Sequence, residues 1–219
     1  MRSPDEHAPK QSEFGEPGRE AKVMTERTLK IRSATTDDAS ALAELINFAG
    51  EGLPVYLWEG MAQDGQTAWD VGRQRAQREE GSFSYHNAMI AEINGAVAGC
   101  LIGYRLPDVP DVVDFEEMPA MFRPLQELED LAPGTWYVNV LAVYPKFRGS
   151  GIGTSLLDVA NEQAKATEAA GLSIIVSDAN SGARRLYERS GYSFIDDRTM
   201  VKDNWQTAGK NWALLRRTI

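Results

Sequence analysis

The sequence of 219 residues predicts an α/β fold of the α+β type, with strands and helices combined in one domain. An apolar run at 136–143 has the length and composition of a buried strand, and a glycine-rich turn and a helical pattern follow it. The dipeptide Asn94-Gly95 joins two expected strands, at 88–93 and 96–105, into a hairpin. A further strand and helix are expected across 172–190.

The glycine-rich turn after the first of these strands predicts a binding site. Pro145 ends the strand, because proline has no N–H group to donate to a neighbouring strand. Arg148, Gly149, Gly151 and Gly153 come next. A helix N-terminus presents free N–H groups at the positive end of a dipole, so phosphate is the usual ligand of such a turn. The helix is indicated by apolar residues with helical spacing, namely Leu156, Val159, Ala160 and Ala164.

A glycine-rich turn of this kind has three other interpretations. The glycine spacing across 149–153 is not that of a dinucleotide fingerprint, and no acidic residue closes a following strand as a ribose partner would. No Lys-Ser/Thr pair follows the last glycine, so the turn is not a Walker loop either. A turn that is merely rich in glycine is the plain alternative.

Composition and charge argue against several classes of protein. The formal net charge of −9 argues against a nucleic-acid-binding surface and is compatible with a cationic acceptor such as an amine. The single cysteine, Cys100, excludes an intramolecular disulfide and suggests a reducing compartment; its apolar surroundings predict a small buried residue. His7 and His86 lack ligand spacing, so no metal site is expected. Without an apolar run of membrane-spanning length or a signal peptide, we expect a cytoplasmic protein.

The N-terminal part has a different composition from the rest. Residues 1–26 are rich in Pro, Gly, Glu and Ser, which predicts a disordered tail. Met24 is an alternative natural start of the chain. The alternating pattern at 28–32 predicts the first strand, so the folded domain is expected to span 27–219.

The next segment is expected to contain two helices. Thr35 and Asp38 have the spacing of a capping box at the start of the first helix. Residues 52–54 end that helix, and the aromatic-rich stretch 56–58 is expected to form a turn. A second helix is predicted at 67–80, where a threonine provides the cap and a glycine follows the end. The apolar face of the first helix consists of Ala39, Leu42, Ala43 and Ile46.

An acidic segment occupies 108–130. Its apolar residues predict a short helix whose length is limited by Pro119 and Pro124. A run of charges is usually a solvated face, but one that overhangs a site would attract a cationic acceptor. The acidic residues are Asp111, Asp114, Glu116, Glu117, Glu127, Glu129 and Asp130.

A second signature follows the glycine-rich turn. A strand at 172–176 leads into a short helix at 181–190, and further strands are predicted at 192–195 and 211–217. The segment 196–210 is expected to be a long loop beside the acceptor site. The stretch around the short helix is similar to motif B of the GNAT N-acetyltransferase superfamily, through Asn180-x-x-Ala183-x-x-Leu186-Tyr187-x-x-x-Gly191-Tyr192. The earlier turn resembles motif A of the same family, through Arg148-x-x-Gly151-x-Gly153.

This resemblance implies a fold and a co-substrate. The GNAT fold has a central mixed, mostly antiparallel sheet of about six to seven strands, flanked by helices. Two of its strands, here 136–143 and 172–176, splay apart like a V. The family's co-substrate is acetyl-CoA, whose acetyl group passes to an amine. The resemblance therefore implies an acetyl-CoA-dependent N-acetyltransferase that acts by direct attack of the amine.

The resemblance also assigns roles to residues. Asn180 is expected to bond the pantetheine arm or its neighbourhood. Tyr187 is expected to act as general acid on the leaving thiolate, because its O–H group is a donor whose pKa is near that of a thiol. The pantetheine arm is expected to pair with the backbone of Leu141, Ala142 and Val143. The phosphates are expected to lie on Arg148, Gly149, Ser150, Gly151, Ile152, Gly153 and Thr154.

The acceptor and the base are less determined. Glu51, Tyr56 and Asn139 are candidate acceptor contacts, with a packing cluster and a solvated glutamate as the alternative. Trp58 is expected to be a packing residue. Several relatives in this family carry a glutamate at the position of Ile175, and some carry an acidic residue at that of Asn139. A water chain to Glu51 or Asp178 is one substitute for such a base.

Other functions remain open from the sequence. The leading interpretation is an acetyltransferase for a small cationic amine or a protein amine, with a homodimer as one oligomeric state. A non-catalytic sensor that binds an acyl-CoA has the same fold. A transferase that uses a longer acyl-CoA is a third interpretation.

Overall fold

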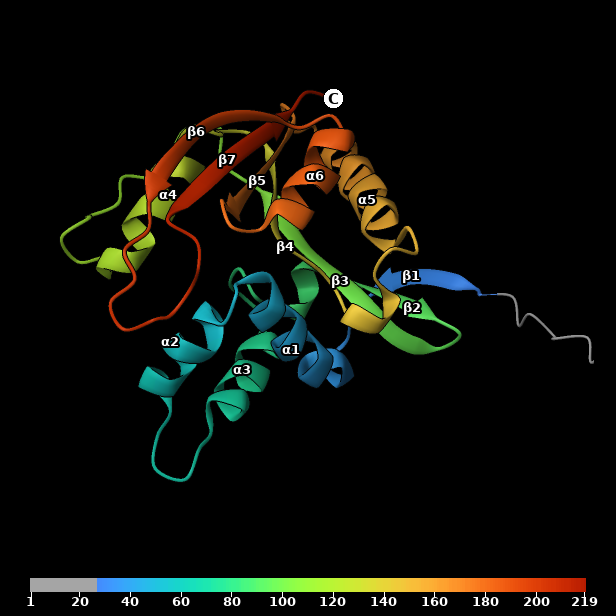
Figure 1. Cartoon of the computed structure of the whole chain (residues 1–219), viewed down its shortest axis with the longest axis horizontal. Coiled ribbons are helices and arrows are strands. Elements are labelled where there is room, and N and C mark those ends of the chain that lie inside the picture. Colours follow the sequence, from blue (N-terminus) through green and yellow to red (C-terminus); the bar gives the residue numbers. More distant parts are fainter. Residues whose placement is uncertain (1–26) are drawn as a thin grey trace, which may run out of the picture.

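A single sheet runs through the part of the chain that the computed structural model describes, residues 27–219 (Figure 1). The expected disordered tail at 1–26 lies outside these residues. The order of the seven strands is β1-β2-β3-β4-β5-β7-β6, and only β4 and β5 pair in parallel. The predicted mixed, mostly antiparallel sheet is confirmed. The strands are β1 (Leu29–Ser33), β2 (Ala88–Ile93), β3 (Ala96–Arg105), β4 (Trp136–Val143), β5 (Leu172–Ser177), β6 (Ser193–Thr199) and β7 (Asn211–Arg217).

Helices cover both faces of the sheet (Figure 1). On one face, α5 and α6 bury side chains of β3, β4, β5 and β7 in the first core. On the other face, α1 and α3 close a second core over β2, β3 and β4, and α4 packs on β5, β6 and β7. The helices are α1 (Ala39–Ala49), α2 (Leu53–Met61), α3 (Ala68–Ala76), α4 (Arg123–Glu129), α5 (Ile152–Ala166) and α6 (Ser181–Arg189).

The two parallel strands separate soon after they meet. β4 and β5 pair at three positions only, and the last pair is Val138 with Ile174. Beyond it β4 continues to Val143 with β3 on its other side, while β5 continues along β7. The sheet is therefore splayed, as predicted, and the edge of β4 that follows Val138 is open toward β5. This opening is where the site forms.

A β-bulge shapes β4 at the same place. Ile102 of β3 pairs with Val140 and the next residue, Gly103, pairs with Val138, so Asn139 has no partner on β3. Such an extra residue bends a strand and re-aims its side chains. Gly103 is required there, because a Cβ atom would lie only 2.1 Å from the ring of Trp136. The bulge places Asn139 at the opening between the strands.

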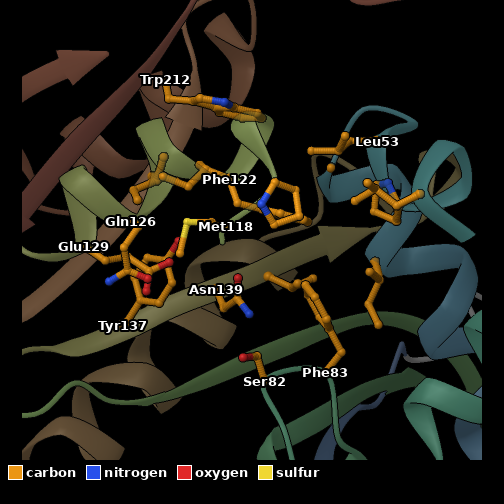
Figure 2. Close-up of a pocket in the computed structure, with 18 of the residues that line it drawn as sticks. Leu53, Ser82, Phe83, Met118, Phe122, Gln126, Glu129, Tyr137, Asn139 and Trp212 are labelled. Carbon is orange, nitrogen blue, oxygen red and sulfur yellow. The ribbon is translucent and has the colours of Figure 1, made fainter. Parts of the chain in front are cut away.

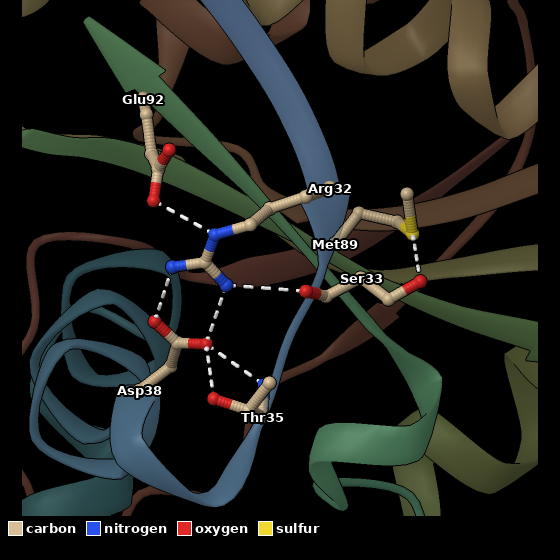
Figure 3. A network of polar contacts seen from close by, with 6 residues as sticks. All are labelled: Arg32, Ser33, Thr35, Asp38, Met89 and Glu92. Atoms are coloured by element: carbon tan, nitrogen blue, oxygen red, sulfur yellow. Dashed lines mark hydrogen bonds and ion pairs between the residues drawn. The ribbon is translucent and has the colours of Figure 1, made fainter. Parts of the chain in front are cut away.

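An ion-pair network joins β1, β2 and the start of α1 (Figure 3). The Arg32 guanidinium donates to both Asp38 carboxylate oxygens at 2.7 and 2.8 Å, and its Nε donates to Glu92 at 2.7 Å. Asp38 also accepts from the backbone N–H of Thr35, which completes the predicted capping box. Arg32 holds the pKa of the buried Asp38 carboxyl below its usual value. The network fixes the angle at which the chain enters α1.

Several local predictions are confirmed closely. The hairpin turn has φ of 50° at Asn94 and 79° at Gly95, the conformation that favours these two residue types. Its strands, and β4, have the predicted bounds. Cys100 is fully buried on β3, and desolvation raises the pKa of its thiol to about 12, so it is an inert packing residue.

Three local predictions were wrong. The stretch 56–58 is not a turn but lies within α2, because Pro54 occupies the first turn of that helix, where a missing N–H is tolerated. The helix predicted at 67–80 ends at Ala76, the last buried residue of its pattern. The loop predicted at 196–210 starts later, since β6 continues to Thr199. The charged residues of β6 fit this because β6 is an edge strand of the sheet.

Candidate active site

Two cavities meet at the opening between β4 and β5. One is a groove of about 530 Å³ on the side of α5 and α6. The other is a cavity of about 770 Å³ on the opposite side, under α2 and α4 (Figure 2). The residues that line both are Ala49, Asn139, Ile175 and Trp212. A molecule in the groove and a molecule in the cavity would therefore meet beside these four side chains.

The groove is lined by the sequence signatures. The end of β4, the glycine-rich turn, the end of β5 and α6 form its walls. Its two charged lining residues are Arg148 and Arg189, and no carboxylate among residues 27–219 lines it. On a chain with a formal net charge of −9, this is a local environment suited to an anion. Predicted cofactor residues that line the groove are Leu141, Ala142, Val143, Arg148, Gly149, Gly151, Ile152, Gly153, Thr154 and Asn180.

The turn has the backbone conformation of an anion-binding loop. Gly149 and Gly151 have φ of 74° and 85°, a backbone conformation that residues other than glycine rarely adopt. A Cβ atom added to either would meet only open space. Gly151 caps α5 without a side chain, so no side chain occupies the first N–H groups of this helix. Gly153 serves packing instead, because its Cβ would lie 2.9 Å from Leu186 of α6.

Tyr187 lines the groove from α6. Its side chain is buried, with 4% of the residue exposed, and its ring packs on Tyr192 with centroids 5.9 Å apart. Burial raises the pKa of its hydroxyl, so the group is held as a neutral donor. Within residues 27–219 the buried side-chain group that lacks a hydrogen-bond partner is the hydroxyl of its neighbour Tyr192. Asn180 starts the helix, and its Oδ1 accepts from the N–H of Ala183 at 3.1 Å.

The larger cavity has mostly apolar walls. It lies over β3 and β4, between α2 and α4, and the segment 112–119 forms part of its lining. Its polar groups are few, as is typical of small-molecule sites. The aromatic residues that line it are Trp58, Phe83, Tyr104, Phe122, Tyr137 and Trp212. The charged residues that line it are Arg75, Asp114, Glu117 and Glu129.

Glu129 was not singled out by the sequence. It lies at the end of α4 beside Tyr137, and Figure 2 shows both next to Gln126 at one end of the cavity. Burial, assisted by the neighbouring Asp130, raises the pKa of its carboxyl to about 7, although the neighbouring Tyr137 hydroxyl acts to lower that pKa. The missed signal is helical spacing, since Leu125, Gln126 and Glu129 share one face of α4 and line the cavity, as does Phe122 just before the helix.

Some predicted site residues lie elsewhere. Glu51 and Tyr56 line neither cavity, and the Glu51 carboxylate accepts from the Thr207 hydroxyl at 3.1 Å. The Asp178 carboxylate accepts from the backbone N–H groups at the start of β7, which makes it a structural group. The Ser150 hydroxyl donates to the carbonyl of Phe147 and does not line the groove.

Trp58 packs in the second core, as expected, with 3% of the residue exposed, and its ring also lines the cavity. No residue of the segment 200–210 lines either cavity. In residues 27–219, no group of His, Cys, Asp and Glu side chains has the arrangement of a metal site. None of the helices in the same range is long and apolar enough to cross a membrane.

The splayed sheet with its glycine-rich turn is the architecture of a GNAT-type protein. The family model of the acetyltransferase (GNAT) family matches residues 55–192, which is more than half of the chain. The chain therefore belongs to the GNAT acetyltransferase family. The comparison with curated proteins finds no match.

Solved structures share this fold. A mosquito protein described as arylalkylamine N-acetyltransferase like 5b has a TM-score of 0.62 at 17% identity, over 88% of this chain and 100% of that one. An N-acetyltransferase from Staphylococcus aureus has a TM-score of 0.60 at 18% identity, over 85% of this chain and 99% of that one. A structure described as an acetyltransferase has a TM-score of 0.60 at 24% identity, over 87% and 99%. At these identities the likeness shows the fold alone.

Proposed function

We propose that this protein is an N-acetyltransferase that moves the acetyl group of acetyl-CoA directly to a primary amine. The observation that carries the proposal is the meeting of two cavities of opposite character at Asn139 and Ile175. The groove has arginines and no carboxylate among the described residues, whereas the cavity has three carboxylates and one arginine. This arrangement suits an anionic co-substrate on one side and a cationic acceptor on the other.

The groove fits acetyl-CoA, the co-substrate of this family. The first N–H groups of α5 and the turn with Gly149 and Gly151 would hold the phosphates, and Arg148 and Arg189 would add charge. Arg148 already donates from Nε to the carbonyl of Val143 at 3.0 Å, which keeps its side chain along the groove. The open edge of β4 from Asn139 to Val143 would pair with the amides of the pantetheine arm as an added strand does.

Tyr187 is the proposed general acid. Its neutral hydroxyl belongs to a buried residue that lines the groove. A proton held there can pass to the sulfur when the C–S bond breaks. The acceptor amine forms the new C–N bond from the side of the cavity. Direct attack is favoured because Cys100, the chain's one cysteine, is fully buried and lines neither cavity.

Release of CoA thiol with a panel of amines tests the proposal. We expect thiol release that depends on the amine and matches the amide formed. Tyr187→Phe is expected to lower kcat by about 100-fold, as loss of a general acid does, while acetyl-CoA binding measured by calorimetry stays within twofold. Tyr85→Phe is the matched control, since Tyr85 lines neither cavity.

Two outcomes would point to the alternatives. Binding of acetyl-CoA with no amine ever acetylated would support a non-catalytic sensor. Tighter binding and faster transfer from a longer acyl-CoA would support a transferase of a different acyl group. An unchanged rate in Tyr187→Phe would remove this residue from the chemistry.

A further inference from the structure

The cavity beside the groove has a size and lining that indicate its ligand. Its volume of about 770 Å³ lies within the range of small-molecule sites. We infer that the acceptor is a small amine with a bulky apolar group, and that Glu129 holds its ammonium group and takes a proton from it. This inference rests on the proposed function, because it assigns the acceptor side of the same site.

The walls of the cavity favour an apolar body. Leu53, Phe83, Phe122 and Trp212 face the space from four different elements or segments. Each buried methylene group of a ligand there is worth about 0.8 kcal/mol. Asp114 and Glu117 also line the cavity, but a polyamine would still place part of its charged length against these apolar walls, which costs free energy. A lone lysine side chain from a protein would leave much of the space unfilled.

The acidic groups of the cavity occupy defined positions. Glu129 projects from the inward face of α4, whereas Glu127, two residues earlier, faces outward and pairs with Arg198 at 2.7 Å. The same helix thus separates a paired carboxylate on the surface from one that lines the cavity. No salt bridge to Glu129 forms within residues 27–219. An ammonium ion from a ligand would supply the missing partner.

The surroundings of Glu129 set its protonation. The groups that face it are Asp130 just after α4, Tyr137 on β4 and Tyr104 on β3. On β6, Arg198 pairs with Glu127 and Asp196. From β7 the neighbour in this core is the apolar Leu214. The other charges that line the cavity are those of Asp114, Glu117 and Arg75.

The proton count closes with two groups of the chain. The ammonium group gives one proton to the Glu129 carboxylate, and the amine lone pair then forms the C–N bond to the acetyl carbon. The C–S bond breaks, and the sulfur takes a proton from the Tyr187 hydroxyl. The nitrogen loses its second proton to restore Tyr187, and the proton on Glu129 leaves to solvent. Acetyl-CoA and an ammonium ion thus give an amide, CoA thiol and one free proton.

A matched set of amines tests the acceptor class. We expect 2-phenylethylamine and tryptamine to exceed ethanolamine, spermidine and a lysine peptide in kcat/KM by at least about tenfold. A higher kcat/KM for spermidine or the peptide would overturn the inference and leave the proposed function standing. If the protein acetylated neither these amines nor any other, both this inference and the proposed function would be overturned.

The variant Glu129→Gln tests the base. With 2-phenylethylamine at pH 7, kcat/KM is expected to fall by about 100-fold, and its rise with pH, centred near 7 in the unaltered enzyme, is expected to vanish. Glu127→Gln removes the same charge from the outer face of α4. It is expected to change neither kcat/KM nor its dependence on pH. A full rate or an unchanged pH profile in Glu129→Gln would contradict the role of Glu129. Binding of acetyl-CoA, measured by calorimetry, should be equal in all three proteins.

Discussion

Asn139 and Ile175 are the first residues of β4 and β5 beyond the last pair of these parallel strands, and both line the groove and the cavity. Their positions follow from backbone structure: the strands stop pairing at Val138 and Ile174, and the bulge leaves Asn139 without a partner on β3. Neither side chain can act as a base near neutral pH. Of the three carboxylates that line the cavity, the half-buried one is that of Glu129, which comes from α4, a separate element.

Glu129 is expected to make stability depend on pH. Its pKa of about 7 in the folded state lies above the ordinary 4.5, so stability is full below pH 4.5 and falls as the pH rises through 7. Glu129→Gln is expected to unfold like the unaltered protein at pH 4.5. At pH 8 the variant should be more stable by about 3 kcal/mol, as measured by urea unfolding. If Glu129→Gln and the unaltered protein were equally stable at pH 8 as well as at pH 4.5, burial would not destabilise the charged form of this carboxyl.

The Arg32–Asp38 pair is expected to make stability depend on pH in the opposite direction. Because Arg32 holds the pKa of Asp38 below its ordinary value of 3.8, this contribution is present above pH 3.8 and is lost as the pH falls through the folded-state pKa. Asp38→Asn at pH 7 is expected to cost about 1–3 kcal/mol, because it leaves Arg32 without its strongest partner. Asp37→Asn, on the exposed neighbour, should change the free energy of unfolding by less than about 0.5 kcal/mol. A similar loss of unfolding free energy in both variants would show that the ion pair of Asp38 with Arg32 does not stabilise the fold.

The glycine opposite the bulge is expected to be intolerant of a side chain. A Cβ atom on Gly103 would overlap the Trp136 ring at 2.1 Å and approach the carbonyl of Tyr137 at 2.7 Å. Gly103→Ala should therefore destabilise the fold by about 2–4 kcal/mol in thermal or urea unfolding. Gly60→Ala is the control, since Gly60 lies in α2 with open space around it and should gain up to about 1 kcal/mol. A neutral Gly103→Ala would contradict the packing of the bulge.

The glycine that caps α5 is expected to govern co-substrate binding. Gly151 has φ of 85° with open space beyond it, so an alanine there costs about 1–2 kcal/mol from backbone conformation alone. We expect Gly151→Ala to weaken acetyl-CoA binding by roughly tenfold in calorimetry, because the turn relaxes away from the phosphates. Gly65→Ala, whose φ of 82° lies in a turn outside both cavities, is expected to lose stability but not affinity.

The sequence predicts the groove far better than the cavity, for a physical reason. The groove is built from continuous stretches, in which a strand, a turn and a helix start follow one another, so local patterns reveal it. The cavity is assembled from α2, α4 and the segment 112–119, which are distant in the chain. Glu127 and Glu129 look alike in an acidic run, and only the packing of α4 against β5, β6 and β7 turns one outward and the other inward.

The central claim is that a donor in the groove and an amine in the cavity meet beside Asn139 and Ile175. A conjugate that joins the sulfur of CoA to the nitrogen of 2-phenylethylamine through an acetyl bridge would occupy both spaces at once. Calorimetry should show that it binds at least about 100-fold more tightly than CoA alone, because the second half binds at high effective concentration. An affinity equal to that of CoA would contradict the claim.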